Sequence, residues 1–478
     1  MRHRLPTLLL CLWPCMATAD TTPAPEAGTQ TIWRAVLFDG LKAGWASTER
    51  SVDADGITTR ERMELDIRRG GVQIRLSSLE ETREDGDGEP QAFIAEQQVS
   101  EQRTRYSGVR QSDGQFAVQV EVGGQVSEQT LDLPPQTLFF EGQRQALLAT
   151  GLSAGKTVEM LAFQPSMLAS VRTVTEIGAE TSVELLGEDR RLVPIVQSVY
   201  YGDQPLRVSA AVDQQFEPQR ISLDMQGLRI EMVTCDQACA QAPSQAPEFF
   251  TQLLIPAPAL PRTAMQSPVH YRLSGVDVDA LPHTGHQQVR EGELWIDPAG
   301  LSEADEPADL ARHLAPTAWL QADHDEIRQL AERALGNAKK RPAERMQAAE
   351  NYVRQYIQGK TLSVGYASAL EVSRNRRGDC TEHALLLAAI GRAGGIPTRV
   401  LTGFARVEQF AGADQVFVPH AWMEAWVDGG WRGYDAALGG FGSGHIALAV
   451  GDGDPTRFYA TLDLLTRLRV DAAEVATR

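Results

Sequence analysis

The run Arg377-Gly378-Asp379-Cys380-Thr381-Glu382-His383-Ala384 decides the fold of this chain, because it places a cysteine where a helix begins. After Cys380, apolar residues recur at helical spacing until the Gly394-Gly395 pair and Pro397 stop the pattern. The start of a helix offers unpaired backbone N–H groups and the positive end of the helix dipole, and both favour thiolate over thiol. The thiolate is the nucleophilic form, so Cys380 is the candidate nucleophile.

A candidate general base lies forty residues after Cys380, in the predicted strand 418–427. His420 lies near the start of this strand, Asp428-Gly429-Gly430 predicts a turn, and the returning strand ends on Asp435. The order cysteine, histidine, aspartate supplies a nucleophile, a base and a group that orients the base. Direct pairing of His420 with Asp435 would centre the hairpin slightly before the glycine pair, so a bulge or a diagonal contact is required.

With these residues the chain resembles the bacterial transglutaminase-like superfamily over roughly residues 316–450. Five elements follow the order of that family: Gly378–Ala384, Ala393–Val400, Gly403, His420–Glu424, and Trp431 with Tyr434-Asp435. The resemblance implies a papain-like core, in which a helix bearing the cysteine packs on an antiparallel sheet that supplies the histidine and the aspartate. The chain departs from the family at Ala436 and Ala437, where the family usually has Pro-Thr after the aspartate.

Length and patterning divide the rest of the chain. With 478 residues, two or three domains are expected. Alternating strands such as Phe116–Val122 fill the first half, whereas helical periodicity begins near Asp325–Leu335 and Pro342–Ile357. We predict an α+β chain made of a signal peptide (1–19), an antiparallel β-rich domain (31–241), a Pro-rich linker (242–268), a small β lead-in segment (269–315) and a transglutaminase-like catalytic domain (316–478).

The first nineteen residues are typical of a secretory signal. Arg2 and Arg4 form the positive start, residues 8–13 form the apolar middle, and Ala17-Thr18-Ala19 is the expected cleavage site. A lipid anchor at Cys11 or Cys15 is a weaker alternative, because neither cysteine follows small residues. No other stretch has the apolar length of a membrane span. We therefore expect a periplasmic or secreted protein whose mature chain does not insert into a membrane.

The cysteines fit that expectation. Removal of the signal leaves Cys235, Cys239 and Cys380. The first two are close enough for a local disulfide, and the three residues between them differ from the usual two-residue redox spacing. A metal site would need more ligands than this pair supplies. Cys380 then remains unpaired, and a catalytic thiol is one explanation for an odd cysteine in an exported protein.

Other residues near the candidate centre have plainer interpretations. His383 shares a helix face with Cys380 and is a rival base, although the matching family position is structural. The basic run Arg374, Arg376 and Arg377 predicts a solvated loop, with recognition of an acidic substrate as the alternative. Trp422, Trp426 and Trp431 suit either a substrate cleft or the core. Tyr366 is one candidate for the second oxyanion donor.

Two further clusters resemble ligand sites but lack the required ligand sets. The acidic run Glu84–Glu89 does not have the twelve-residue pattern of a calcium loop, so it predicts a hairpin tip. His283 and His286 lie three residues apart with no third ligand nearby, which predicts a surface loop. The net charge of −18 disfavours nucleic acid and anionic lipid headgroups as partners.

These observations predict a cysteine-dependent acyl transfer. Cys380 would attack a peptide or protein amide, His420 would move the proton and Asp435 would hold the imidazole, giving a thioester that needs no cofactor or metal. Water as acceptor makes the protein a cysteine peptidase or amidase, which is our first expectation. A lysine amine as acceptor would make it a cross-linking protein-glutamine gamma-glutamyltransferase. A rival hypothesis is a non-catalytic module in which the β domain binds a cell-envelope protein.

Overall fold

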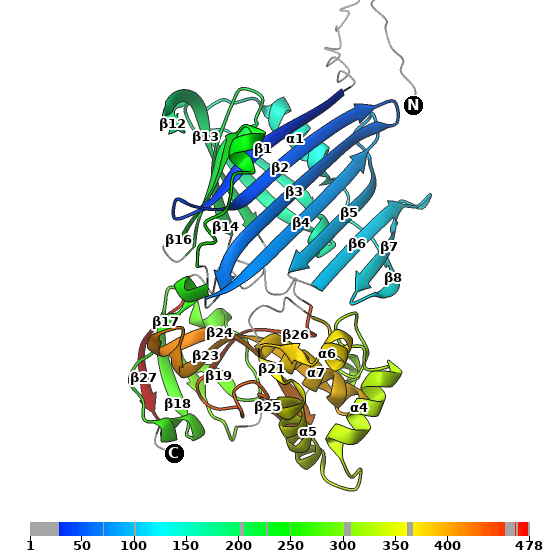
Figure 1. Cartoon of the computed structure of the whole chain (residues 1–478), viewed down its shortest axis with the longest axis vertical. Helices are drawn as coiled ribbons and strands as arrows, with labels where there is room; N and C mark the ends of the chain where they lie inside the picture. The colour runs from blue at the N-terminus through cyan, green and yellow to red at the C-terminus, as the bar shows by residue number, and fades with distance from the viewer. Residues whose placement is uncertain are drawn as a thin grey trace, which may run out of the picture.

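The computed structural model of the chain describes residues 28–69, 71–99, 102–200, 205–225, 228–248, 250–300, 307–360, 367–454, 464 and 467–476. The predicted signal segment and Tyr366 lie outside the described residues. Two bodies stack along the long axis (Figure 1), and we call them the β-rich body (residues 28–240) and the mixed body (residues 250–476). The predicted α+β class is confirmed.

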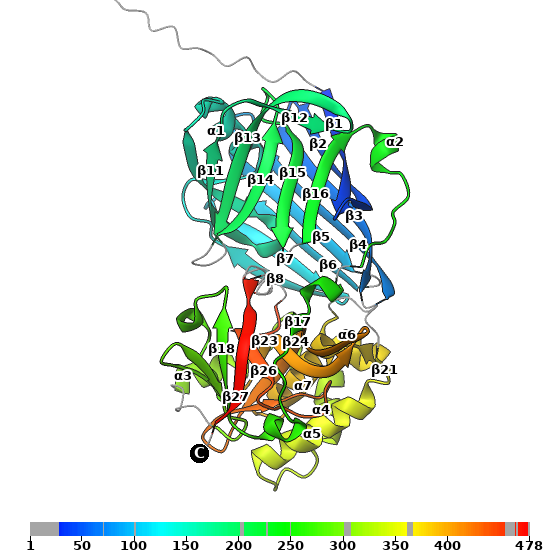
Figure 2. The same cartoon turned by 90° about the vertical axis from the view of Figure 1, so that its left-hand side faces the viewer.

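The β-rich body is one large curved sheet, whose second half faces the viewer in Figure 2. Its strands run in the order β8-β7-β6-β5-β4-β3-β2-β1-β16-β15-β14-β13-β11-β10-β9, with β12 paired to β13. All of these pairs are antiparallel except β9 with β10. The elements are β1 (Gly28–Phe38), β2 (Leu41–Asp53), β3 (Gly56–Arg69), β4 (Val72–Glu84), β5 (Pro90–Val99), β6 (Gln102–Arg110), β7 (Phe116–Val122), β8 (Gln125–Leu131), β9 (Thr137–Leu138), α1 (Phe140–Thr150), β10 (Thr157–Gln164), β11 (Ala169–Ile177), β12 (Thr181–Leu185), β13 (Glu188–Tyr200), β14 (Leu206–Val212), β15 (Pro218–Met225), β16 (Leu228–Cys235) and α2 (Gln237–Ala240).

The inner face of this sheet is filled by aromatic side chains and by α1. The rings of Phe139 and Phe163 stack with centroids 4.5 Å apart, and Phe93 meets Phe163 edge-on at 4.8 Å. The first turn of α1 has unpaired N–H groups, and the buried carboxylate of Glu84 accepts two of them, from Glu141 at 3.1 Å and from Gly142 at 2.7 Å. The sequence predicted a hairpin tip for Glu84, but its side chain instead caps the N-terminus of α1 on the inner face of the sheet.

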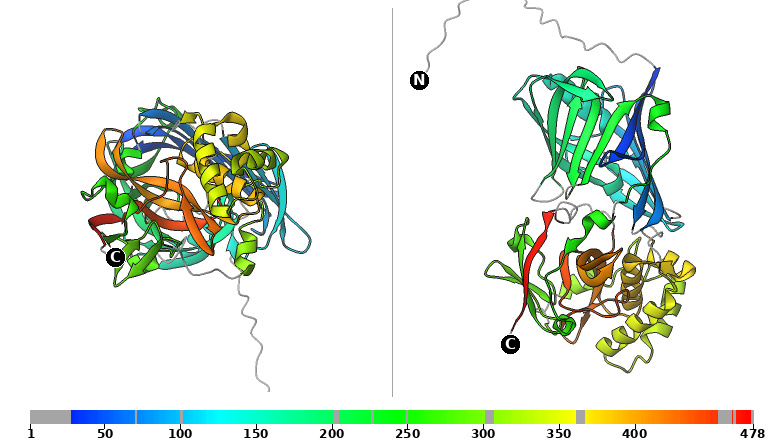
Figure 3. Two further views of the ribbon diagram at one scale, coloured as in Figure 1. Left: turned by 90° about the horizontal axis from the view of Figure 1, so that it is seen from below. Right: turned by 60° about the vertical axis from the view of Figure 1, so that its left-hand side comes forward.

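The mixed body places helices beside two small sheets (Figure 3). One sheet has the order β17-β24-β23-β26 with β25 on β24, the second has the order β19-β20-β18-β27, and β21 pairs with β22. The elements are β17 (Ile255–Pro256), β18 (Val269–Ser274), β19 (Gln287–Arg290), β20 (Glu293–Ile296), α3 (Pro307–Arg312), α4 (Asp325–Leu335), α5 (Pro342–Tyr356), β21 (Gly359–Lys360), α6 (Ala369–Asn375), β22 (Arg377–Gly378), α7 (Cys380–Ala393), β23 (Thr398–Phe410), β24 (Ala413–Val427), β25 (Gly430–Tyr434), β26 (His445–Gly451) and β27 (Arg469–Val475). Among the described residues, no helix combines the length and the hydropathy needed to cross a membrane.

The segments predicted as linker and lead-in pack as part of the mixed body. Within the predicted linker, β17 adds to the edge of β24 through the pair Ile255 with Phe417. Within the predicted lead-in, β18 pairs with the C-terminal strand β27. Their apolar side chains share one buried cluster with the central sheet, and this cluster includes Val269, Tyr271 and Phe404. The chain therefore wraps around the central sheet before it enters the helices.

The two bodies also contact each other through buried apolar residues. One continuous cluster contains Phe93 and Phe116 of the β-rich body, Trp319, and the apolar faces of α4, α5 and α7. At the β7–β8 turn, Gly123 has φ of +58°, and a Cβ there would lie 2.7 Å from the side chain of Glu371 on α6. The turn can approach α6 only because this residue has no side chain.

Candidate active site

The start of α7 is built by its own sequence. Asp379 is the N-cap and accepts the Thr381 N–H at 3.1 Å, while Glu382 accepts the Asp379 N–H at 2.8 Å, which completes a capping box. The second oxygen of Glu382 accepts the N–H of Ala367 at 3.0 Å. Burial, followed by the nearby Asp379 carboxylate, raises the pKa of Glu382 well above its ordinary value. These contacts fix Cys380 at the first position of the helix.

His420 and Asp435 meet by a diagonal contact between two strands. The β24–β25 register runs without a shift from Val427 opposite Gly430 to Met423 opposite Tyr434. Asp435, just past β25, therefore lies one step further along, and His420 reaches it diagonally on the same face. The distance from His420 Nε2 to Asp435 Oδ2 is 2.8 Å. The diagonal alternative is the correct one, and no bulge is involved in this hairpin.

The imidazole of His420 connects the carboxylate to the sulfur. Its Nε2 is occupied by Asp435, and its side chain also hydrogen-bonds Cys380, which leaves Nδ1 as the nitrogen for the thiol. Burial alone would lower the pKa of His420, but the Asp435 carboxylate and the Cys380 sulfur outweigh it and raise this pKa to about 10. Cys380 is partly exposed, whereas His420 and Asp435 are buried. Of these three side chains, Cys380 is therefore the one that a substrate can reach.

The Asp435 carboxylate is held by four donors. Its Oδ1 accepts the N–H groups of Ala437 at 2.8 Å and Leu438 at 3.1 Å. Its Oδ2 accepts Nε2 of His420 at 2.8 Å and Nε2 of His445 at 2.9 Å. Burial acts to raise the pKa of Asp435, but the charge and hydrogen bonds of the two histidines hold it well below its usual range. The carboxylate is therefore permanently ionised at physiological pH.

Two residues of this site, His445 and Glu350, were missed at the level of sequence. His445 opens β26, which no motif links to Asp435. Glu350 lies on the buried face of α5, and its Oε1 accepts the Asp435 N–H at 2.7 Å. A signal for Glu350 did exist, because a charged residue stands among Met346, Ala349 and Val353 on an apolar helix face.

The surface-loop prediction is wrong for His286. This side chain is buried, its Nδ1 lies 2.9 Å from the Asp297 carbonyl oxygen, and its Nε2 accepts the Gly433 N–H at 2.7 Å. Burial lowers its pKa, which fits a neutral ring with one donor and one acceptor nitrogen. The reason is tertiary, because the lead-in segment packs against β25, the strand that carries the chain to Asp435. His283 is exposed, as predicted.

The remaining sequence candidates have structural partners. His383 Nδ1 lies 2.5 Å from the Asp379 carbonyl oxygen, so its ring holds the start of α7. Arg374 pairs with Glu326 of α4 at 2.6 Å, and Arg376 lies over the Tyr356 ring at 4.7 Å. Trp422 and Trp431 are buried in the core.

The two peripheral predictions from the sequence agree with the structure. Cys235 and Cys239 form the predicted disulfide, and Cys380 is a free thiol. Residues 85–89 of the acidic run form the predicted hairpin tip between β4 and β5, where Asp85 accepts the N–H groups of Asp87 and Glu89, whereas Glu84 is buried at the end of β4.

One group of side chains has a composition that suits a metal ion. The ligand atoms of His420, Asp435 and His445 all lie within 4.8 Å of one another. Both imidazole Nε2 atoms point to the same carboxylate oxygen at hydrogen-bond distance, so two hydrogen bonds account for the arrangement.

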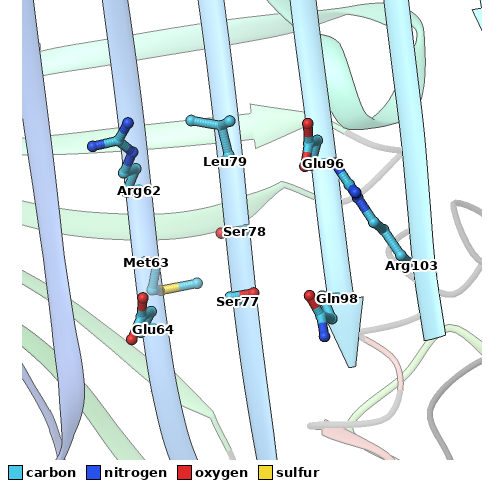
Figure 4. Close-up of a pocket in the computed structure, with 9 residues that line it drawn as sticks. All are labelled: Arg62, Met63, Glu64, Ser77, Ser78, Leu79, Glu96, Gln98 and Arg103. Carbon is cyan, nitrogen blue, oxygen red and sulfur yellow. Dashed lines mark hydrogen bonds and ion pairs between the residues drawn. The ribbon is translucent and has the colours of Figure 1, made fainter. Parts of the chain in front are cut away.

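A shallow pocket lies on the β-rich body, and Figure 4 shows the residues that line it. It measures about 170 Å³ and is lined by strands β3 to β6. Its residues Glu96 and Gln98 alternate with the buried Phe93 and Ala95, so the pocket lies on the outer face of the sheet. None of the described residues that line it belongs to the candidate active site.

Comparison with known proteins finds a family model that is similar to part of the chain. A family model described as the Transglutaminase-like superfamily matches residues 328–436, which include Cys380, His420 and Asp435. A search of curated proteins found no match.

Three solved structures show similarity at low TM-scores. A β-barrel-like protein with a domain of unknown function from Brucella abortus is 18% identical, with 43% of this chain and 95% of that chain covered and a TM-score of 0.36. A cysteine protease candidate from Cytophaga hutchinsonii is 18% identical, with 45% and 84% covered and a TM-score of 0.27. A protease candidate from Parabacteroides distasonis is 15% identical, with 78% and 65% covered and a TM-score of 0.19. On the family match, the chain carries a domain of the transglutaminase-like superfamily.

Proposed function

We propose that this protein transfers acyl groups from peptide or protein amides through a thioester on Cys380, with water as the usual acceptor. The observation that carries the proposal is the unbroken contact chain from Cys380 through His420 to Asp435, which ends in an ionised carboxylate. A cysteine held this way reacts as a thiolate beside an imidazolium, which is the arrangement that nucleophilic catalysis needs.

Each residue has one chemical task in this reaction. The Cys380 thiolate attacks the amide carbonyl carbon, and the charge moves to the carbonyl oxygen. His420 Nδ1 gives its proton to the leaving amine as the C–N bond breaks, which leaves a thioester and a neutral imidazole. Water then attacks the thioester while Nδ1 takes its proton, and the carboxylic acid and free thiolate are released. Asp435 keeps the ring in place and stabilises its charged form.

The start of α7 also supplies an oxyanion donor. The backbone N–H of Cys380 lies in the first turn of the helix, where N–H groups have no intrahelical acceptor. Such a group can donate to the oxygen that becomes negative during the attack. The helix dipole acts in the same direction.

The acceptor is tested by product analysis. The protein is incubated with a proteome-derived peptide library and a dansyl-labelled primary amine, and the products are identified by mass spectrometry. We expect peptides with new termini, because water reaches an exposed thioester at far higher concentration than any amine. Label on glutamine with loss of ammonia would assign transamidation instead. Cys380→Ala is the control, and equal products from both proteins, or no product from either, would contradict the proposal.

The pH dependence of Cys380 alkylation tests the ion pair without a substrate. Because the pKa of His420 is about 10, the imidazolium persists throughout the range from pH 6 to 8. We expect the alkylation rate of Cys380 by iodoacetamide to change little across this range, whereas the rate of a free thiol rises roughly 80-fold with its thiolate fraction. Rates are read from the Cys380 peptide by mass spectrometry, so other cysteines do not interfere. The free-thiol slope should appear in His420→Gln and in unfolded protein, and the same slope in the native wild type would refute the ion pair.

We also propose the cellular compartment in which the protein acts. The predicted signal segment supports a periplasmic or secreted location, and the Cys235–Cys239 disulfide fits an oxidising compartment. Peptides or proteins of that compartment are the proposed substrates, and cell-envelope proteins are among the proposed partners.

A further inference from the structure

The geometry points to His445 as a positioning residue that fixes the Asp435 carboxylate, so that the catalytic centre is a relay of four side chains rather than three. The inference rests on the proposed function, because Asp435 matters for chemistry only if His420 serves Cys380. It assigns a role to a residue that lies beyond the matched family region, which ends at 436.

The first argument is the number of acceptors on Asp435. A carboxylate accepts about four hydrogen bonds, and four donors occupy this one. The two backbone donors on Oδ1 come from Ala437 and Leu438, which follow Asp435 directly. His445 is the only described donor, apart from His420, that holds Oδ2. Without His445, the contact with His420 would be the remaining described hydrogen bond on Oδ2. The position of this oxygen would then depend on the same imidazole that it has to orient.

The second argument is that His445 is itself immobile. Its ring is 6% exposed, and its Nδ1, which lies 3.0 Å from the Gly442 carbonyl oxygen, accepts the Gly442 N–H at 3.3 Å, so that Nε2 carries the proton donated to Asp435. The ring centroid lies 4.8 Å from that of Phe441 and 5.2 Å from that of Trp422, and Trp422 is also nearly parallel to the His420 ring at 6.3 Å. Trp422 thus packs against both imidazoles. A ring enclosed in this way presents Nε2 in one direction only.

The third argument is the anchoring of the loop before β26. Ser443 donates its hydroxyl to the Ala264 carbonyl oxygen at 2.9 Å, and its own carbonyl accepts the Tyr271 hydroxyl at 2.9 Å. Gly403, which pairs with His420 across β23 and β24, would place a Cβ only 2.0 Å from the Ile446 carbonyl oxygen. Only glycine at this point lets β26 pair this closely with β23. The segments before the matched domain therefore determine where His445 lies.

The experiment compares three substitutions of His445 in the full chain. In His445→Gln the amide nitrogen lies three bonds from Cβ, as Nε2 does in histidine, so the donor to Asp435 is kept. In His445→Asn the amide is one bond shorter and cannot reach, and in His445→Phe the ring stays but the donor is lost. The readouts are the alkylation rate of Cys380 at pH 7, and kcat and KM on a peptide cleaved by the wild type, all per folded molecule.

We expect His445→Phe and His445→Asn to lower kcat and the alkylation rate about 10- to 100-fold with KM little changed, because a buried charged acceptor loses one donor. His445→Gln should stay within about 3-fold of the wild type, since it restores that bond. If His445→Phe does not fold, the comparison of the glutamine variant with the asparagine variant still decides. Equal rates for these two variants, or an unchanged rate in His445→Phe, would overturn the role of His445.

Two further outcomes separate this inference from others. If the wild type shows the flat alkylation profile and His445→Phe shows the same rate, only the inference fails and the proposed function stands. If the wild type itself shows the free-thiol slope, the proposed function fails, and the role of His445 fails with it. Elemental analysis of the wild type should find no bound zinc. If the wild type instead holds one equivalent of zinc that His445→Phe loses, His445 would be a metal ligand and not a positioning residue.

Discussion

Replacing Cys380 by alanine is expected to abolish turnover, with a loss of about 10⁵- to 10⁶-fold in kcat, because no other nucleophile can form the thioester. The Cys380 side chain is small and partly exposed, and it lies at the start of α7. Alanine is a good helix former, so it is tolerated at this position. The fold should therefore survive, with little change in the thermal midpoint. Turnover of the library-derived peptide and the unfolding curve measure the two expectations.

The neighbouring Thr381→Ser variant is the matched control for this substitution. It alters a side chain in the same helical turn and leaves the sulfur in place, so turnover should stay near that of the wild type. A Cys380→Ala protein that keeps more than about a tenth of the wild-type rate would show that the thioester route is wrong. A Cys380→Ser protein should retain only a small residual rate, since a hydroxyl is the weaker nucleophile at its ordinary pKa.

Asp435→Asn is expected to lower kcat by about 10³- to 10⁴-fold and to destabilise the fold by roughly 3 to 5 kcal/mol, as loss of one partner of a buried pair does. Both oxygens of Asp435 accept two donors each. An amide has one accepting and one donating end, so each of its two orientations sets an NH₂ group against two donors. The variant loses the charge that favours the imidazolium and also gains a repulsive contact.

The stability loss should depend on pH in a defined way. The pKa of Asp435 is depressed, so its contribution is present above about pH 4, the ordinary value for aspartate, and is lost as the pH falls. The pKa of His420 is raised to about 10, so its contribution is complete below about pH 6.5 and is lost as the pH rises through 10. Urea unfolding should therefore show the largest difference between wild type and Asp435→Asn near pH 5.5, and a smaller one at pH 9.

Asp428→Asn is the control for this prediction. It makes the same chemical change at the exposed turn of the same hairpin, where the backbone has φ of 54° and asparagine is tolerated. Its ion pair with Arg341 is long, at 4.0 Å, and exposed. We expect rates and stability close to the wild type. A loss as large as that of Asp435→Asn would mean that hairpin distortion, rather than the buried carboxylate, causes the effect.

Local signals in the sequence predicted much of the domain that carries the centre. The helix expected over residues 325–335 coincides with α4, and the one expected over 342–357 ends one residue earlier, as α5. Cys380 begins α7 because Asp379 and Glu382 cap the helix, and both residues lie within two positions of Cys380 in the chain. The hairpin of His420 and Asp435 is likewise a local element. Periodicity, caps and turns depend on neighbours within a few residues, so one sequence contains them in full.

The sequence by itself therefore determined the helix that presents the sulfur, the hairpin that brings imidazole to carboxylate, and the order of the three residues. Only the tertiary structure decided that His445 donates to that carboxylate, that Glu350 accepts the Asp435 backbone N–H and that His286 accepts the Gly433 N–H, since these three residues come from segments far apart in the chain. The reason is physical: buried polar groups must find hydrogen-bond partners, and segments that pack together across long separations in the chain supply many of them. No local pattern encodes which distant donor completes the set.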